Sequence, residues 1–188
     1  PDPDPEPDPD PDPTPDPDPT PDPEPDPVIE VQWGTDAANL TGSGTLIDAF
    51  YAAAAENSTV AYIKMISDVT LEVFPNTTGG TVTFDLNGKK LSTGGLFSIN
   101  GADITITDTA GNGVIDAVDG EQAVALVGGK LTLLSGEIHG EWDLYWEGGD
   151  LDLQSYPMLT GFVLYYAGGA LDLPDASILL PDGYSVYY

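Results

Sequence analysis

The residues best suited to chemistry are aspartates that recur at a fixed position in the second half of the chain. Asp150 and Asp152 alternate with leucines, so both belong to one face of a strand, and Asp172 should stack on Asp152 one repeat later. A glycosidase needs two carboxylates about 5–10 Å apart around one cleft. The same alternation is typical of the solvated outer face of a sheet, and we favour this second interpretation.

Calcium is the metal ion that best fits the residues available. Residues 108–113 are superficially similar to an acidic, glycine-rich calcium loop, but they lack the full spacing and the distal glutamate of an EF-hand. The chain has 32 acidic residues against 4 lysines and carries a net charge of −28, so stacked aspartates need counter-ions. Specific calcium sites and diffuse counter-ions both stay open. The weak candidates for metal ligands are Asp108, Asp150, Asp152 and Asp172.

No residue is predicted to be catalytic. His139 is the single histidine, and no serine near it stands in a nucleophile-elbow context, so a catalytic triad has no support. The chain contains no cysteine, which excludes disulfides, thiolate zinc sites and cysteine nucleophiles. We expect a structural role for His139 and a protein that is not an enzyme.

The charge also limits the partners. A net charge of −28 repels nucleic acid phosphates and anionic membrane surfaces, so we expect no nucleic acid partner. No apolar run approaches the roughly 18 residues that a membrane crossing needs, so we expect no membrane insertion. Three Asn-x-Ser/Thr sequons are candidate glycosylation sites, and each lies at a predicted corner or loop. They begin at Asn39, Asn57 and Asn76.

The elements that position these residues follow from one phrase, Gly-Gly-x-apolar-x-apolar, which occurs five times. The copies begin at positions 79, 101, 128, 148 and 168, the second with Gly-Ala in place of Gly-Gly. A turn pair followed by strict alternation indicates a strand after a tight corner, and its return every 20–30 residues or so predicts a solenoid. The predicted inward ladder consists of Val82, Phe84, Ile104, Ile106, Leu131, Leu133, Leu151, Leu153, Leu171 and Leu173.

One helix is expected, over residues 45–55, with a cap at Ser43 or Thr45 and an apolar stripe. The stripe consists of Leu46, Ala49, Phe50 and Ala53. Such a helix would cover the open end of the solenoid. We expect a strand at residues 28–33, a loop at 34–44, strands at 60–66 and 69–74, and coils over about 59–188. Residues 28–188 then form one all-β domain.

Residues 1–27 are expected to be a separate segment. Proline alternates there with Asp, Glu or Thr, which removes half of the backbone donors and favours an extended polyproline II rod. The rod either spaces the domain from a surface or packs against the solenoid, a neighbouring subunit or calcium ions.

Residues 45–140 resemble bacterial and archaeal cell-surface proteins of the pectin lyase-like, right-handed parallel β-helix type. The similarity lies in the helix and in the runs 62–71, 82–91, 104–108 and 128–138. The proline-rich segment resembles the wall-spanning spacers of such proteins. The resemblance implies a right-handed parallel β-helix and says little about activity, because the family includes adhesins, surface repeats and some carbohydrate-active enzymes. A pectate-type lyase uses aspartate-bound calcium and an arginine or lysine base, and this chain has no arginine.

We therefore expect a non-catalytic extracellular structural module, either a cell-surface protein or a subunit of a head-to-tail filament. Its partners would be further copies of itself or cell-wall and surface components. The alternative is a carbohydrate-binding or carbohydrate-cleaving β-helix. The candidate assembly residues stand near the two ends of the solenoid and are Val28, Ile29, Trp33, Tyr184, Tyr187 and Tyr188.

Overall fold

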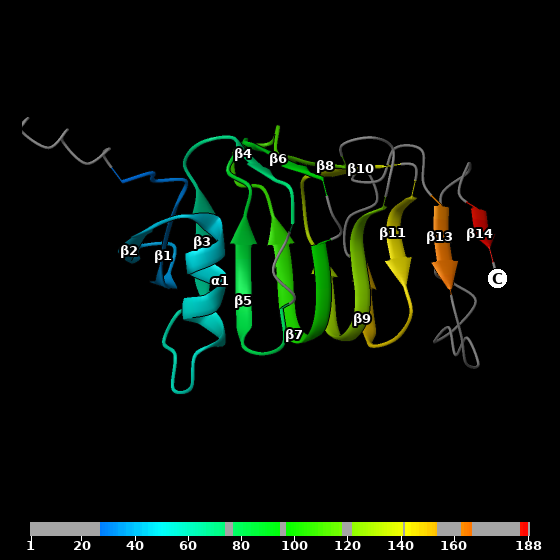
Figure 1. The fold of residues 1–188 in the computed structure, drawn as a ribbon, viewed down its shortest axis with the longest axis horizontal. Coiled ribbons are helices and arrows are strands. Elements are labelled where there is room, and N and C mark those ends of the chain that lie inside the picture. Colours follow the sequence, from blue (N-terminus) through cyan, green and yellow to red (C-terminus); the bar gives the residue numbers. More distant parts are fainter. Residues whose placement is uncertain are drawn as a thin grey trace, which may run out of the picture.

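The computed structural model describes residues 27–73, 77–94, 97–117, 122–140, 142–153, 163–166 and 185–187. They form a β-solenoid of about four turns built of parallel sheets, with one short helix, as the sequence predicts (Figure 1). Apart from Pro27, the proline-rich segment lies outside these residues. The helix is α1 (Leu46–Ala54), and the strands are β1 (Val31–Asp36), β2 (Asn39–Gly44), β3 (Tyr62–Met65), β4 (Val69–Leu71), β5 (Thr81–Asp85), β6 (Lys90–Thr93), β7 (Phe97–Thr107), β8 (Val114–Ala117), β9 (Gln122–Leu133), β10 (Glu137–His139), β11 (Trp142–Trp146), β12 (Asp150–Leu153), β13 (Val163–Tyr166) and β14 (Ser185–Tyr187).

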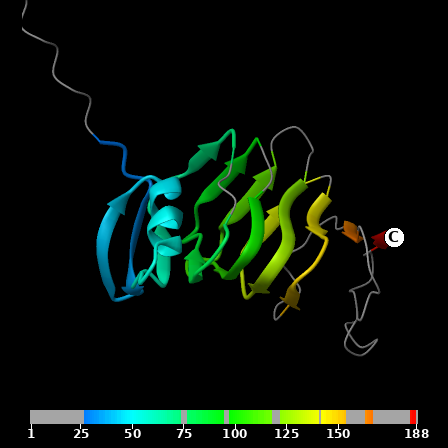
Figure 2. The same cartoon turned by 60° about the horizontal axis from the view of Figure 1, so that its bottom comes forward.

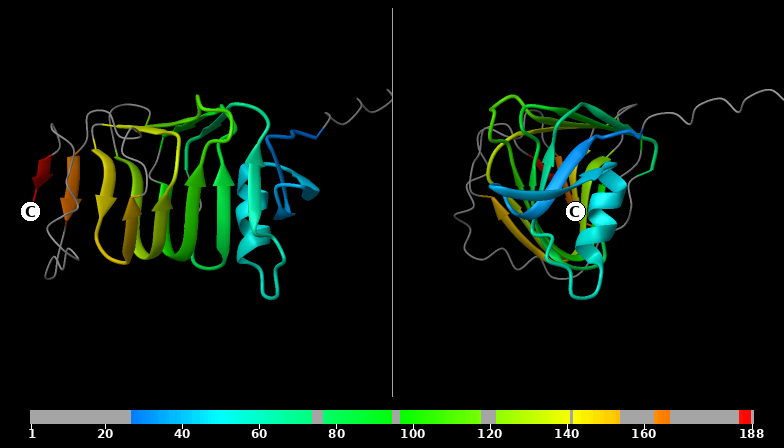
Figure 3. Two further views of the ribbon diagram at one scale, coloured as in Figure 1. Left: turned by 180° about the vertical axis from the view of Figure 1, so that it is seen from behind. Right: turned by 90° about the vertical axis from the view of Figure 1, so that its left-hand side faces the viewer.

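The strands line three walls around a single core. The first wall holds β3, β5, β12 and the second halves of β7 and β9, and the second wall holds β4, β6, β8 and β10. The third wall holds β11, β13, β14 and the first halves of β7 and β9. Strand β9 turns the corner between two walls, because its first half pairs with β11 and its second half with β12. The end-on view in Figure 3 shows the walls enclosing the core, and Figure 2 shows the stacked coils from a second side.

The predicted inward ladder is confirmed where the structure describes it. Val82 pairs in register with Ile104 and Ile104 with Leu131, while Phe84, Ile106 and Leu133 align in the next row. All six side chains are buried. Each contributes roughly 2 kcal/mol to the free energy of unfolding, since a side chain of this size removes that much apolar area from water. Leu151 packs half-buried against the same core, and residues 171–173 lie outside the described ranges.

The glycine phrase forms the corner between the third and first walls. Gly80, Gly101, Gly129 and Gly149 have φ angles between +81° and +103°, which glycine adopts without a Cβ clash. At Gly129 a Cβ atom would also lie 2.2 Å from the carbonyl oxygen of Ala102 in the previous coil. The corner therefore requires glycine both for its backbone conformation and for the close stacking of coils.

Helix α1 lies at the end of the solenoid away from β14 (Figure 1). Thr45 caps it, since its side-chain oxygen accepts a 3.2 Å hydrogen bond from the amide of Asp48, and Glu30 Oε2 accepts another of 2.8 Å from the amide of Leu46. The predicted apolar stripe is buried without exception. The Phe50 ring packs edge-to-face on Phe84 and Phe97, with centroids 5.5 and 5.6 Å away. The helix thus closes the side of the first coil, where no third-wall strand is described.

The loop expected at residues 34–44 is wrong. Residues 39–44 form β2, which pairs antiparallel with β1 in a hairpin, and β1 itself pairs antiparallel with β3. Asp36 makes the turn, because its Oδ1 accepts hydrogen bonds from the amides of Ala38 and Asn39 at 2.9 and 3.0 Å. Glycine at 34, 42 and 44 masked the strand in the sequence. Gly42 and Gly44 leave room for the indole of Trp33, which would be 2.2 Å from a Cβ on Gly42.

Candidate functional site

Two buried aspartates, Asp85 and Asp108, stand at the corner that follows the first wall. Asp85 is fully buried, and its carboxylate accepts four hydrogen bonds. The donors are the hydroxyl of Tyr62 at 2.8 Å, the amide of Asn87 at 2.9 Å, and the amide and hydroxyl of Thr109 at 3.0 and 2.8 Å. These donors come from three successive coils, so the carboxylate joins the coils through their backbone.

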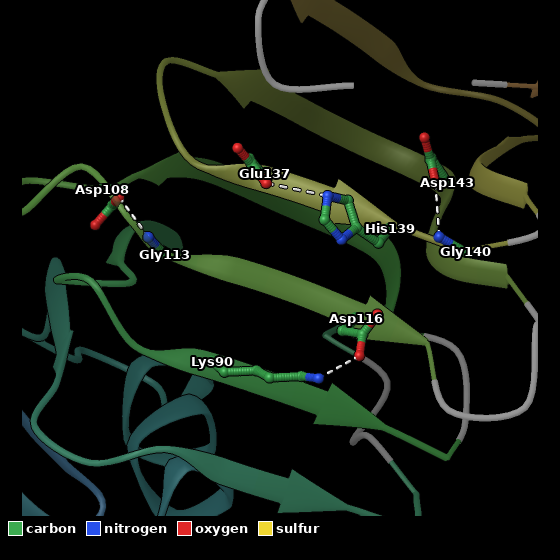
Figure 4. Close-up of polar contacts among 8 residues, drawn as sticks. All are labelled: Lys90, Asp108, Gly113, Asp116, Glu137, His139, Gly140 and Asp143. Atoms are coloured by element: carbon green, nitrogen blue, oxygen red, sulfur yellow. Dashed lines mark hydrogen bonds and ion pairs between the residues drawn. The ribbon is translucent and has the colours of Figure 1, made fainter. Parts of the chain in front are cut away.

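Asp108 has the same role one coil later. It is 6% exposed, and its Oδ1 accepts from the amide of Gly88 while its Oδ2 accepts from the amide of Gly113, each at 2.6 Å. Its own amide donates to the hydroxyl of Ser135 at 2.7 Å. Figure 4 shows the contact with Gly113. Both carboxylate oxygens are therefore engaged by backbone donors of two coils.

The neighbourhood of Asp85 changes the chemistry of Tyr62. Burial of the phenol, together with its hydrogen bond and charge interaction with Asp85, raises the pKa of Tyr62 well above its usual value of 10.0. The phenol therefore stays protonated and acts as a hydrogen-bond donor. Buried carboxylates that accept several backbone hydrogen bonds satisfy donors that would otherwise be unpaired, which is a structural use of these residues.

The outer face of the second wall carries a row of polar side chains from neighbouring strands. Ser92, Asp116 and His139 stand at matching positions of β6, β8 and β10. Asp116 forms an ion pair with Lys90, and His139 Nε2 lies 3.1 Å from Glu137 Oε2 (Figure 4). Asp116 separates the serine from the histidine, which places them two strand spacings or about 10 Å apart. His139 is thus too far from Ser92 to act as its base.

Asp143 is the carboxyl group with the most unusual environment in the described residues. It is fully buried, its Oδ1 accepts a 2.7 Å hydrogen bond from the amide of Gly140, and its Oδ2 has no hydrogen-bond partner. Burial raises the pKa of Asp143 to about 7, and the amide of Gly140 and the charge of His139 oppose this rise. Asp143 and His139 both titrate near neutral pH, so this part of the solenoid is the most sensitive to acid.

The predicted carboxylate face of β12 is present. Asp150 is exposed beside Lys130 on the neighbouring strand, and Asp152 lies 3.6 Å from the same lysine. Asp172 falls outside the described ranges. Within those ranges, no three histidine, aspartate or glutamate side chains come together as a set able to hold a metal ion. Calcium binding through these aspartates stays a prediction.

The sequons differ in their local structure. Asn57 is exposed in the turn after α1, with a positive φ of 61°. Asn39 is exposed in β2, but its side-chain amide donates to both oxygens of Asp36 at 2.9 and 2.8 Å. That hydrogen bond, together with the amide of Ala38, lowers the pKa of Asp36. Asn76 lies outside the described residues.

The assembly candidates are described at one end only. Val28 is 65% exposed and Ile29 47% exposed, just before the hairpin. Trp33 is half-buried against the glycines of β2 and against the core, so it serves the fold of this chain. Tyr187 is the last residue of β14, Tyr184 and Tyr188 lie outside the described residues, and none of these side chains is described.

Sequence reasoning missed the roles of Asp85, Asp108 and Asp143. The available signal was an Asn-Gly turn or a glycine shortly after an aspartate at the end of a strand, as at Asp85-Leu86-Asn87-Gly88. Asp143 gives no such signal, because it alternates with Trp142 and Leu144 like any outward residue of a strand.

Within the described ranges, no helix has the length and apolar character that crossing a membrane requires. Comparison of the chain with protein-family models, with curated proteins and with solved structures finds no match in any of the three.

Proposed function

We propose that this chain is a non-catalytic, extracellular structural module: a right-handed β-solenoid carried on an acidic polyproline II rod, in a cell-surface protein or a head-to-tail filament. The observation that carries the proposal is the use of the buried carboxylates. Asp85 and Asp108 accept seven hydrogen bonds between them, four and three, and all the donors belong to the corners of this chain. The side chains best placed for acid–base chemistry thus hold the coils together.

The arrangement of strands supports assembly from end to end. The long sheet ends in β2 on one side and β14 on the other, so its two edges differ in sequence and lie at opposite ends of the solenoid (Figure 1). A strand edge is a template for pairing with another chain. Contact between two different edges is heterologous and propagates into a filament. Val28 and Ile29 add exposed apolar surface beside the β2 edge.

Electron microscopy and light scattering of the full chain over a range of concentrations, with and without a chelator, test the proposal. We expect concentration-dependent filaments or linear oligomers. Ile29→Lys should shorten them by placing a charge beside the edge. Tyr51→Lys is the matched control, because Tyr51 is 64% exposed on α1. Monomers under every condition would contradict the filament, and cleavage of a polysaccharide by the chain would contradict the non-catalytic role.

A further inference from the structure

The chain contains three Asn-Gly pairs, at residues 87–88, 100–101 and 112–113. Asn-Gly is the dipeptide most prone to spontaneous deamidation, because glycine has no side chain to hinder its own backbone nitrogen. That nitrogen attacks the side-chain carbonyl carbon of the asparagine and gives up its proton to water, a new C–N bond forms, and ammonia leaves. Water then opens the cyclic imide at either carbonyl and gives aspartate or isoaspartate.

Two of the three attacking nitrogens are bound to one carboxylate. The amide of Gly88 donates to Asp108 Oδ1 and the amide of Gly113 donates to Asp108 Oδ2, both at 2.6 Å. Asp108 is buried, so water competes little for these hydrogen bonds. An amide that donates to a carboxylate is held away from the neighbouring asparagine side chain, and the hydrogen bond must break before the nitrogen can attack.

The two asparagines are held to different degrees. Asn87 lies in a turn in which Asn87 and Gly88 both have positive φ, 48° and 71°, and its side-chain amide donates to the carbonyl of Met65 at 2.9 Å. Asn112 is exposed, and no side-chain hydrogen bond of Asn112 is found among the described residues. Protection of the 112–113 pair therefore depends on the Gly113 hydrogen bond to Asp108.

Asn100 and Gly101 provide an internal comparison. Both are exposed at the bulge of β7, where Gly101 has a φ of +103°. Within the described part of the chain, no carboxylate accepts a hydrogen bond from the amide of Gly101. The three pairs thus share their chemistry and differ in this contact.

We propose that Asp108 protects the Asn87–Gly88 and Asn112–Gly113 pairs from deamidation and leaves Asn100 as the site where the folded protein is modified first. The protected pairs lie at a stacked corner, where isoaspartate would insert an extra methylene into the backbone and break the alignment of coils. The protection preserves this corner over the lifetime of the folded chain.

The test is the rate of deamidation at each asparagine, measured by peptide mapping after incubation of the full chain at mildly alkaline pH, folded and in urea. In urea the three rates should be similar. In the folded chain Asn87 and Asn112 should react roughly tenfold or more slowly than in urea, since a hydrogen bond to a charged acceptor must be broken first, and Asn100 should react fastest. Equal rates at all three sites in the folded chain, fast or slow, would overturn the proposal.

A variant separates the carboxylate from folding in general. Asp108→Asn can accept through only one oxygen, so at least one of the two glycine amides loses its acceptor and the adjacent asparagine should react at least severalfold faster. Asp116→Asn is the matched control, because Asp116 pairs with Lys90 on the outer face. Circular dichroism checks that both variants are folded. A folded Asp108→Asn protein with unchanged rates at Asn87 and Asn112 would also overturn the proposal, and should the variant not fold, the comparison of folded and urea-treated wild type decides.

Discussion

The hydroxyl of Tyr62 donates a 2.8 Å hydrogen bond to Oδ2 of Asp85, a residue of the next coil. Tyr62→Phe removes this donor and leaves the ring in place, so we expect a loss of about 1–2 kcal/mol in the free energy of unfolding. Urea titration measures the loss. Tyr51→Phe serves as the control, because Tyr51 is exposed on α1. Equal stabilities of the two variants would show that the hydrogen bond adds nothing to the corner.

Three glycines separate the cost of backbone conformation from the cost of close stacking. Gly129→Ala should lower the free energy of unfolding by about 3 kcal/mol or more, because the new Cβ meets the Ala102 carbonyl oxygen and φ is +81°. Gly111→Ala should cost about 1–2 kcal/mol, since φ is +89° but the space is open. Gly79→Ala has open space and no positive φ, so its effect should stay within about 0.5 kcal/mol. Thermal or urea unfolding ranks the three, and any other order contradicts the explanation of the corner.

The stability of the solenoid should depend on the protonation of Asp143. The folded chain holds this proton up to about pH 7, whereas the unfolded chain loses it near the usual value of 3.8. Between these values the folded state binds more protons, so stability falls as pH rises, by up to about 1.4 kcal/mol per pH unit, and levels off above pH 7. Urea midpoints between pH 4 and pH 8 measure this slope.

Many other carboxylates in this acidic chain also titrate, so the slope of a variant must be compared with that of the wild type. Asp143→Asn removes the one titration and should flatten the difference between pH 4.5 and pH 7, which are roughly the limits set by the two pKa values. Asp150→Asn, at an exposed position, should leave the slope unchanged. Parallel slopes for all three proteins would refute the raised pKa of Asp143.

Phe50 should be the residue of α1 that contributes most to stability. Its ring contacts Phe84 and Phe97 edge-to-face, and Phe50→Ala removes both contacts and leaves a cavity, at a cost of about 3–5 kcal/mol. Tyr51→Ala changes the neighbouring, exposed position and should be nearly neutral. Unfolding monitored by circular dichroism compares the two. A small effect of Phe50→Ala would mean that α1 does not close the first coil.

The sequence predicts most of the scaffold because the signals that set it are local and repeated. The ladder from Val82 to Leu133 alternates strictly, and α1 has both a cap and a four-residue apolar stripe, so each could be recognised without knowledge of the fold. The helix limits differ by one residue at each end from the predicted 45–55.

The sequence does not predict the burial of Asp85, Asp108 and Asp143 because burial of a charge depends on donors that are distant in the chain. Thr109 lies 24 residues from Asp85, and Gly88 lies 20 residues from Asp108. A carboxylate at a corner looks like a solvated turn residue until the neighbouring coil supplies its amides. The β1–β2 hairpin was missed for a related reason, because its glycines make room for the Trp33 indole and read as a loop when taken alone.

Gly129 and Gly149 stand 20 residues apart and meet backbone to backbone, since a Cβ on Gly149 would lie 2.6 Å from the carbonyl oxygen of Gly129. The segment between them is therefore a unit of length as well as a unit of sequence. Duplicating residues 130–149 should preserve the register of Lys130 with Asp150 and of Leu131 with Leu151, and lengthen the body by one strand spacing, about 4.8 Å. A chain built in this way can change its reach in fixed steps without redesign of its core.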